Sequence, residues 1–175
     1  IAHYRFDEAA GSEVVRDSTG FGRAGTLAAG NGSVSPGAEG LAGGQAVAVT
    51  NGGLARIEAT EFDSLEDFTI TLWASQNTLT GDLQTLVGRG FGSPSFALLV
   101  SNGDLLWLQG SDAEPLIATS GGLIQAATAH HITMLADSSA GTRRIAIYVD
   151  GVEAATLASP DRIPDEPDTP LYIGA

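Results

Sequence analysis

Residues 17–22 are the first stretch of the chain whose types and spacing could do chemistry. Their order, Asp-Ser-Thr-Gly-Phe-Gly, brings together a carboxylate, two hydroxyls and two glycines. Carboxylate oxygens and backbone carbonyls exposed by a glycine turn are ligands that a hard cation accepts. The same residues also favour a tight turn, because an aspartate side chain bonds to the backbone that follows it. The pattern therefore predicts either an Asp17-centred turn or an oxygen-lined cation site.

Two tryptophans are candidate ligand contacts. Trp73 and Trp107 each lie in an alternating, strand-like run. An exposed indole offers a flat apolar face with a hydrogen-bonding edge, which suits stacking on a sugar ring. Core packing is the stronger expectation for a tryptophan in so regular a strand.

His130 and His131 are adjacent, so a strand would point them to opposite faces. We expect one of them to be buried and hydrogen-bonded rather than both to form a joint site.

Three carboxylates, Glu61, Asp63 and Glu66, form a third candidate site. Glycosidic bond hydrolysis by a retaining mechanism uses two carboxyl groups roughly 5 Å apart across the sugar. These three precede the strand-like run at 68–76 instead of lying within it, so a solvated turn is the favoured interpretation. The sequence contains no Ser/His/Asp set, phosphate loop or paired-histidine metal motif elsewhere.

The segment 143–157 gives the clearest secondary-structure pattern in the chain, and it indicates how the strands that hold these residues are built. Apolar residues alternate with small or polar ones up to Val149, Asp150-Gly151 interrupts, and a second run begins at Val152. Glycine tolerates the positive φ of a type I′ turn, and aspartate tolerates it better than most residues. The segment therefore predicts a β-hairpin, and the alternating run that starts at residue 129 adds a third antiparallel strand.

Similar short runs recur along the chain, and glycine-rich turns separate them. Further strands are predicted at 3–7, 25–28, 45–49, 54–59, 68–76, 83–89, 95–100, 104–109, 116–119 and 171–174. Residues 29–44 and 159–169 are rich in turn formers and are predicted to be loops. Asn102-Gly103 is another hairpin signal. About a dozen short strands at this spacing favour a β-sandwich or barrel.

Composition limits the protein class. The 175 residues with 43% hydrophobic content suit one domain that buries roughly 70% of its unfolded-chain surface. Its 21 acidic residues and 8 arginines give a formal net charge of −13, which repels nucleic acid and anionic membranes. There is no cysteine, and no apolar run approaches the roughly 20 residues of a membrane span. The chain begins with Ile1 rather than methionine, so we expect a processed protein or a segment of a longer one.

Four segments taken together resemble a known family. Residues 3–27 (HYRFDEAAGSEVVRDSTGFGRAGTL), 67–75 (DFTITLWAS), 130–154 (HHITMLADSSAGTRRIAIYVDGVEA) and 171–175 (LYIGA) are similar in content and order to laminin-G-like, concanavalin A-like jelly-roll domains of secreted bacterial proteins. The resemblance implies an all-β, two-sheet antiparallel jelly-roll over residues 1–175. Family members usually carry a tryptophan just before the first of these histidines, and they continue into a closing strand beyond LYIGA. Here that strand is expected to lie outside this chain or to come from another one, leaving an open edge at Ala175.

The resemblance also implies site roles. In similar domains a D-S-x-G loop looks like a calcium site, which would make Asp17, with Gly20 and Gly22, the Ca²⁺ ligands. The spacing of Glu61, Asp63 and Glu66 is similar to the nucleophile, helper and acid of jelly-roll glucanases.

The leading expectation for function is a non-catalytic binding or adhesion module. It would be secreted or at the cell surface, and it would recognise a glycan or a protein through Trp73 and Trp107. A structural subunit that assembles by strand donation through its open edge is the alternative. A glycoside hydrolase is the lesser candidate.

Overall fold

The structure, a computed structural model, describes residues 1–40, 44–58, 62, 66–90, 94–110, 115–139, 141–158, 163 and 167–174. Its strands form an eight-stranded sheet of order β1-β2-β5-β14-β7-β8-β9-β10, a four-stranded sheet of order β13-β12-β11-β6 and a two-stranded sheet of β3 and β4. The strands are β1 (Val14–Val15), β2 (Gly25–Ala28), β3 (Ser33–Glu39), β4 (Gln45–Thr50), β5 (Leu54–Ile57), β6 (Phe68–Ser75), β7 (Gln84–Arg89), β8 (Phe96–Ser101), β9 (Asp104–Leu108), β10 (Ile117–Ala118), β11 (Ala129–Asp137), β12 (Arg144–Val149), β13 (Val152–Ala158) and β14 (Leu171–Ile173).

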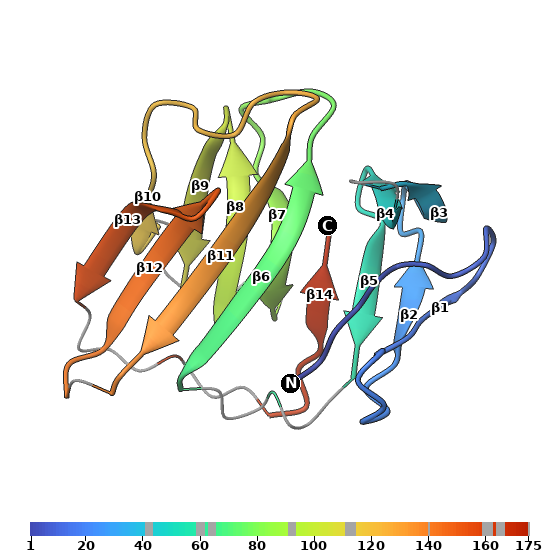
Figure 1. The fold of residues 1–175 in the computed structure, drawn as a ribbon, viewed down its shortest axis with the longest axis horizontal. Helices are drawn as coiled ribbons and strands as arrows, with labels where there is room; N and C mark the ends of the chain where they lie inside the picture. Colours follow the sequence, from blue (N-terminus) through green and yellow to red (C-terminus); the bar gives the residue numbers. More distant parts are fainter. Residues whose placement is uncertain are drawn as a thin grey trace.

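The two larger sheets pack as layers of a sandwich, with the four-stranded sheet in front of β7 to β10 (Figure 1). Between them lies one apolar core. Phe68 of β6 contacts both Phe96 and Trp107 of the opposite sheet, with ring centroids 4.8 and 6.1 Å apart. The predicted all-β, two-sheet antiparallel jelly-roll is confirmed.

The predicted hairpin is confirmed as β12 and β13. Asp150 and Gly151 connect them with φ values of 52° and 82°, as a type I′ turn requires. In β11 every second residue from His130 to Ala136 is buried, so this strand turns one face to the core and the other outward. Asn102-Gly103 likewise joins β8 to β9, with both residues at positive φ.

Two secondary-structure predictions are wrong. Residues 33–39, expected within a loop, form β3, because the proline and glycine sit at a register shift between Pro36 and Ala38 where no regular ladder bond is needed. Residues 3–7, expected to be a strand, contribute only an isolated bridge between Tyr4 and Asp17. Phe6 has a φ of 56°, which interrupts extended backbone.

The open edge was also expected in the wrong place. β14 lies inside the eight-stranded sheet and pairs with β5 on one side and β7 on the other. Among the described strands, the four-stranded sheet instead ends at β6 and β13.

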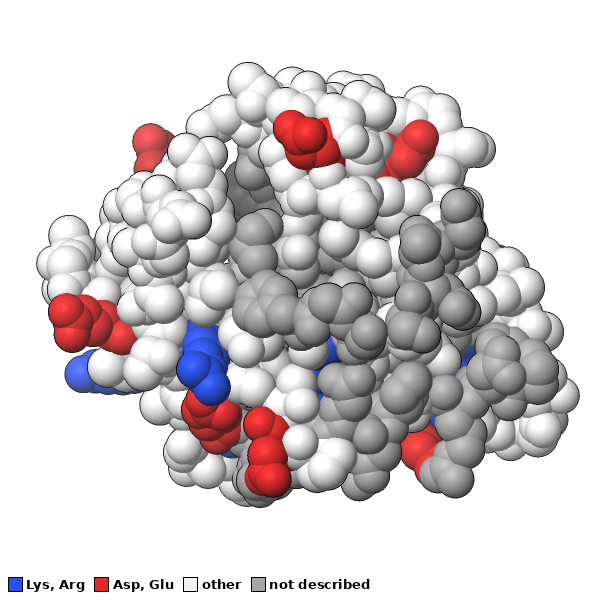
Figure 2. Space-filling view, turned by 180° about the vertical axis from the view of Figure 1, so that it is seen from behind, with Lys and Arg blue, Asp and Glu red and all other residues white. Residues whose placement is uncertain are grey.

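From behind, charged side chains lie mostly toward the margins of the described surface (Figure 2). No helix in the described part of the chain is long and apolar enough to cross a membrane.

Candidate functional site

The outward surface of the four-stranded sheet is the candidate site, and we call it the outer face. It is built by cross-strand neighbours on four strands, since residues paired in register share a face. Trp73 pairs with His131, and Thr133 pairs with both Thr71 and Tyr148. The outer face comprises Thr71, Trp73, His131, Thr133, Asp137, Arg144, Tyr148, Glu153 and Thr156.

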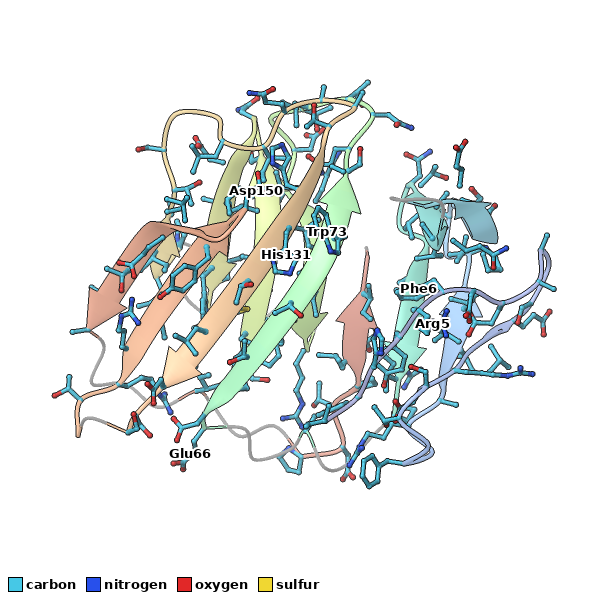
Figure 3. All side chains as sticks on the ribbon, viewed as in Figure 1. Arg5, Phe6, Glu66, Trp73, His131 and Asp150 are labelled. Atoms are coloured by element: carbon cyan, nitrogen blue, oxygen red, sulfur yellow. The ribbon has the colours of Figure 1, made fainter. Side chains whose placement is uncertain are left out.

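Trp73 and His131 form the aromatic part of the outer face. Trp73 is 63% exposed, and the centroids of its ring and the His131 ring are 5.1 Å apart. Both side chains lie on the front of the sheet in Figure 3. The alternation of β6 explains this, because Phe68, Ile70 and Leu72 face the core and leave the tryptophan outside. The expectation that Trp73 packs in the core is therefore wrong.

Trp107 takes the opposite orientation. It is 0% exposed and stacks on Phe68 in the core. A ligand at the surface cannot reach a side chain that has no exposed area. We therefore withdraw Trp107 as a ligand contact and keep the core-packing interpretation for it.

A buried histidine fixes the backbone beneath the aromatic pair. The Gln125 N–H donates to His130 Nε2 at 3.2 Å, which assigns the ring proton to Nδ1. His130 Nδ1 then donates to Asp150 Oδ2 at 2.7 Å, and Asp150 Oδ1 accepts the His131 N–H at 2.9 Å. The hydrogen bond from His130 lowers the pKa of Asp150. The predictions that the two histidines face opposite ways and that one is buried and hydrogen-bonded are both confirmed.

A polar cluster occupies the β12 and β13 side of the outer face. Arg144 Nη2 donates to the Tyr148 hydroxyl at 2.8 Å and to Glu153, and its Nε donates to Thr156 Oγ1 at 3.2 Å. The Tyr148 hydroxyl donates to Glu153 Oε2 at 3.1 Å. The bond to Tyr148, aided by the Glu153 charge, raises the pKa of Arg144. The sequence analysis missed this cluster, although Arg144 and Tyr148 stand at outward positions of the predicted hairpin.

A strip of hydroxyl groups joins the aromatic pair to the polar cluster. Thr71 and Thr133 are direct cross-strand partners. Neither side chain has a hydrogen bond among the interactions of the described residues, so both hydroxyls are available to a ligand. An exposed aromatic ring beside free hydroxyls provides the apolar face and hydrogen-bonding groups that a sugar ring matches.

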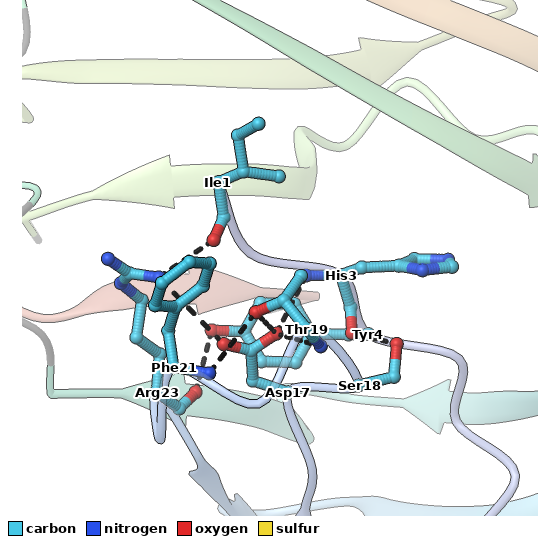
Figure 4. A network of polar contacts seen from close by, with 8 residues as sticks. All are labelled: Ile1, His3, Tyr4, Asp17, Ser18, Thr19, Phe21 and Arg23. Atoms are coloured by element: carbon cyan, nitrogen blue, oxygen red, sulfur yellow. Dashed lines mark hydrogen bonds and ion pairs between the residues drawn. The ribbon is translucent and has the colours of Figure 1, made fainter.

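Asp17 lies away from the outer face, in a turn near the N-terminus (Figure 4). Its Oδ1 accepts hydrogen bonds from the His3 N–H at 3.1 Å, the Thr19 N–H at 3.0 Å and the Thr19 hydroxyl at 2.6 Å. Arg23 Nη1 lies 4.0 Å from Oδ2. These donors, the Thr19 hydroxyl first, lower the pKa of Asp17 to about 2.

The surroundings of Asp17 do not fit a Ca²⁺ site. One carboxylate oxygen is saturated by N–H and O–H donors, and a guanidinium stands beside the other, where a second cation would be repelled. Gly20 and Gly22 have positive φ, as turn residues do. Within the described residues no group of three His, Asp or Glu side chains could hold a metal. The geometry fits the turn interpretation, and we derive no function from calcium there.

The ionised Asp17 should stabilise the fold, and the pH dependence follows from its pKa. Its pKa falls from an ordinary value of 3.8 to about 2 on folding, so its contribution is complete above the ordinary value and is lost as the pH falls through about 2. We expect the unfolding free energy of the native chain to decrease more steeply over this window than that of Asp17→Asn. Urea unfolding at a series of pH values measures both slopes.

Calcium provides the matching control for the turn interpretation. We expect millimolar CaCl₂ to leave the thermal midpoint of both proteins unchanged. A calcium-dependent rise that Asp17→Asn abolishes would contradict the turn interpretation and support the metal site that the resemblance implies.

The carboxylate site cannot be assembled from the described residues. Glu61 and Asp63 lie outside them. Glu66 lies just before β6, at the end of that strand remote from Trp73 (Figure 3). Its backbone carbonyl accepts a hydrogen bond from Arg143 Nη2 at 3.2 Å. Nothing in these contacts positions two carboxyl groups across a sugar.

The fold agrees with what comparison with known proteins finds. The family model of the concanavalin A-like lectin/glucanases superfamily matches residues 43–175, and the chain belongs to this family. This confirms the resemblance drawn from the sequence. No curated protein matches the sequence.

Two solved structures share the fold. The binding domain of Paraclostridial Mosquitocidal Protein 1 superposes with a TM-score of 0.67 at 16% identity, covering 98% of this chain and 44% of that one. Domain 4 of AbnA, a GH43 extracellular arabinanase from Geobacillus stearothermophilus solved with arabinotriose, gives 0.65 at 21% identity, covering 98% and 81%. This chain thus spans less than half of the first structure. At these identities the likeness extends to the fold alone.

Proposed function

We propose that this protein is a non-catalytic binding module that holds a glycan against its outer face. The observation that carries the proposal is the exposed Trp73 ring. It projects from the regular strand β6 and lies beside His131 of the neighbouring strand β11. A strand restrains the ring before the ligand arrives, so little conformational entropy remains to be lost on binding. The core-side network of His130 and Asp150 further restrains the backbone at this point.

The chemistry of the outer face supports a sugar as ligand. The C–H face of a sugar ring would stack on Trp73, while its hydroxyls would bond to Thr71, Thr133 and the Tyr148 hydroxyl. The arabinotriose in domain 4 of AbnA supports the same ligand class for a protein of this fold. We place the module in a secreted or cell-surface protein, where such glycans occur, and include adhesion to glycan-bearing surfaces in the proposal.

Affinity electrophoresis of Trp73→Ala tests the proposal. The probes are soluble arabinan, xylan, galactan and mixed-linkage β-glucan, with arabinan first. We expect the native chain to be retarded by at least one of them, and Trp73→Ala to lose roughly thirtyfold in affinity for it, the loss typical of an aromatic contact that dominates binding. Leu83→Ala is the matched control, since Leu83 is 58% exposed but lies outside the outer face.

Two outcomes would overturn this proposal. Either no probe retards the native chain, or Trp73→Ala and Leu83→Ala bind as tightly as it does. In both cases the outer face would lose its assigned role.

Assembly through a strand edge is the second candidate function. β6 has no strand on its other side among the described residues, and its sequence FTITLWAS contains no charge, proline or glycine to discourage pairing. Its inward side chains Phe68, Ile70 and Leu72 are only partly buried. A partner strand could therefore extend the sheet there. Sedimentation that finds only monomers at high concentration would remove this candidate.

A further inference from the structure

The outer face carries few positive charges. Of the seven arginines that the structure describes, only Arg144 belongs to this face, and the chain has no lysine. Arg143, its neighbour, is buried and donates to the Glu66 carbonyl instead. Any anionic group of a ligand on the described outer face would therefore depend on Arg144.

Arg144 is already engaged. Its Nε donates to Thr156 and its Nη2 to Tyr148 and Glu153, which engages three of its five N–H donors, including both on Nη2, the nitrogen that side-on and end-on pairing with an anion share. A sulfate or carboxylate would have to displace Glu153, the charged partner, to gain the paired hydrogen bonds that make arginine an anion ligand. The exchange would replace one carboxylate by another and leave Glu153 without its cation.

Other carboxylates reinforce this bias. Asp137 pairs in register with Arg144 at one end of the outer face, and Asp150 stands in the turn at the other end. Hydrogen bonds from Ser139 and from His130, respectively, lower the pKa of each carboxyl, so both are ionised at neutral pH. On the outer face itself the carboxylates of Asp137 and Glu153 outnumber the one guanidinium, and Asp150 adds a negative charge at the far end, so the local potential opposes anionic ligands.

The spacing of the ligand contacts sets a minimum length. Trp73 and Tyr148 are separated by two strand intervals across the sheet and by two residues along it. Standard strand spacing places them about 12 Å apart, which exceeds the length of a single sugar ring. Thr133 lies on the strand between them and Thr71 lies beside it on the strand of Trp73, so a chain of sugars that touches both ends also passes the free hydroxyls.

We infer that the outer face selects uncharged oligosaccharides of at least two sugar units and discriminates against anionic glycans. This inference rests on the proposed function, because it specifies the ligand of the same site. Stacking on Trp73 supplies affinity for any sugar with an apolar face, the Thr71 and Thr133 hydroxyls and the Tyr148 cluster select length, and Glu153 excludes negative charge by occupying Arg144.

Calorimetric titration with defined sugars tests the inference. The neutral probes are arabinotriose, xylotriose and cellotriose with their monosaccharides, and the anionic probe is trigalacturonate. Titration at 0.15 M salt, where the screening length is about 8 Å, limits the effect of the overall charge. We expect the best neutral trisaccharide to bind at least roughly tenfold more tightly than its monosaccharide and than trigalacturonate.

The role of Glu153 is tested by a variant that should gain affinity for the anionic sugar. Glu153→Gln releases the charge of Arg144, so we expect trigalacturonate to bind roughly tenfold more tightly to this variant than to the native chain. Glu58→Gln is the matched control, because Glu58 pairs with Arg56 on the surface of the other sheet. It removes the same overall charge and should bring no such gain.

The outcomes separate the inference from the proposed function. Suppose that binding depends on Trp73 but that trigalacturonate, or the monosaccharide, binds with the same affinity as the best neutral trisaccharide. This result would overturn the inference and leave the proposed function standing. Equal gains in Glu153→Gln and Glu58→Gln would also overturn it. Failure of the native chain to bind any probe, together with no retardation by the polysaccharides, would overturn both.

Discussion

Trp107→Ala is expected to lower the free energy of unfolding by roughly 3–5 kcal/mol, the usual loss when a large buried aromatic side chain is truncated. Trp107 has no exposed area and packs against Phe68 across the sandwich. Alanine would leave a cavity between two sheets whose backbones are held by their hydrogen-bond ladders, so the core cannot collapse to fill it. Urea unfolding followed by far-ultraviolet circular dichroism measures the change.

The two tryptophans provide each other's control. Trp73→Ala should change stability by less than about 0.5 kcal/mol, because an exposed side chain contributes little to the core, while it removes glycan affinity. Trp107→Phe should cost less than Trp107→Ala, since it keeps a ring and removes an indole N–H that has no acceptor among the described residues. Equal losses of stability in Trp73→Ala and Trp107→Ala would refute the division of roles between them.

Arg89→Met is expected to destabilise the protein by roughly 3 kcal/mol or more. Arg89 is 2% exposed. Its Nε donates to the Thr169 carbonyl at 3.0 Å, and its Nη1 donates to the Phe62 carbonyl. Methionine fills most of the volume but donates nothing, so two backbone carbonyls would lose their charged donor inside the protein. Because these carbonyls belong to segments far apart in the sequence, the loss should loosen both.

Arg56→Met is the matched control for this substitution. Arg56 is 48% exposed at its side chain and pairs with Glu58 on the surface, where ion pairs contribute about 0–1 kcal/mol. Thermal unfolding should therefore separate the two variants clearly. A stability of Arg89→Met indistinguishable from that of Arg56→Met would show that the buried guanidinium does not anchor these segments.

Local patterns predicted the hairpins well and the sheet edges poorly. Asp150-Gly151 and Asn102-Gly103 specify their turns by backbone conformation alone, so neighbouring residues carry enough information. β3 was missed because its pairing with β4 outweighs the turn propensity of Pro36, and a bulge accommodates that residue. The position of β14 between β5 and β7 depends on pairing with residues more than 80 positions earlier in the chain, which no local pattern reports.

In the candidate site, too, local patterns were informative and the packing of distant segments was not predictable. The alternation of β6 places Phe68, Ile70 and Leu72 on one side and Trp73 on the other, but alternation alone does not say which side meets the second sheet. Trp73 and Trp107 stand in equally regular strands, and only the packing of the layers exposes one and buries the other. The two-residue turn at Asp150-Gly151 sets Glu153 opposite Tyr148, but Thr156 joins the same face only through the register shift beyond that pair, which the sequence did not indicate.

The order of strands has a consequence for how the chain folds. β11, β12 and β13 follow one another directly, so most of the outer face forms from contacts of low sequence separation. The eight-stranded sheet, by contrast, is divided between β5 and β7 until β14 enters from near the other end of the chain. During synthesis the β11–β13 part of the binding surface can therefore form before the sheet behind it closes, because that sheet needs residues 171–173.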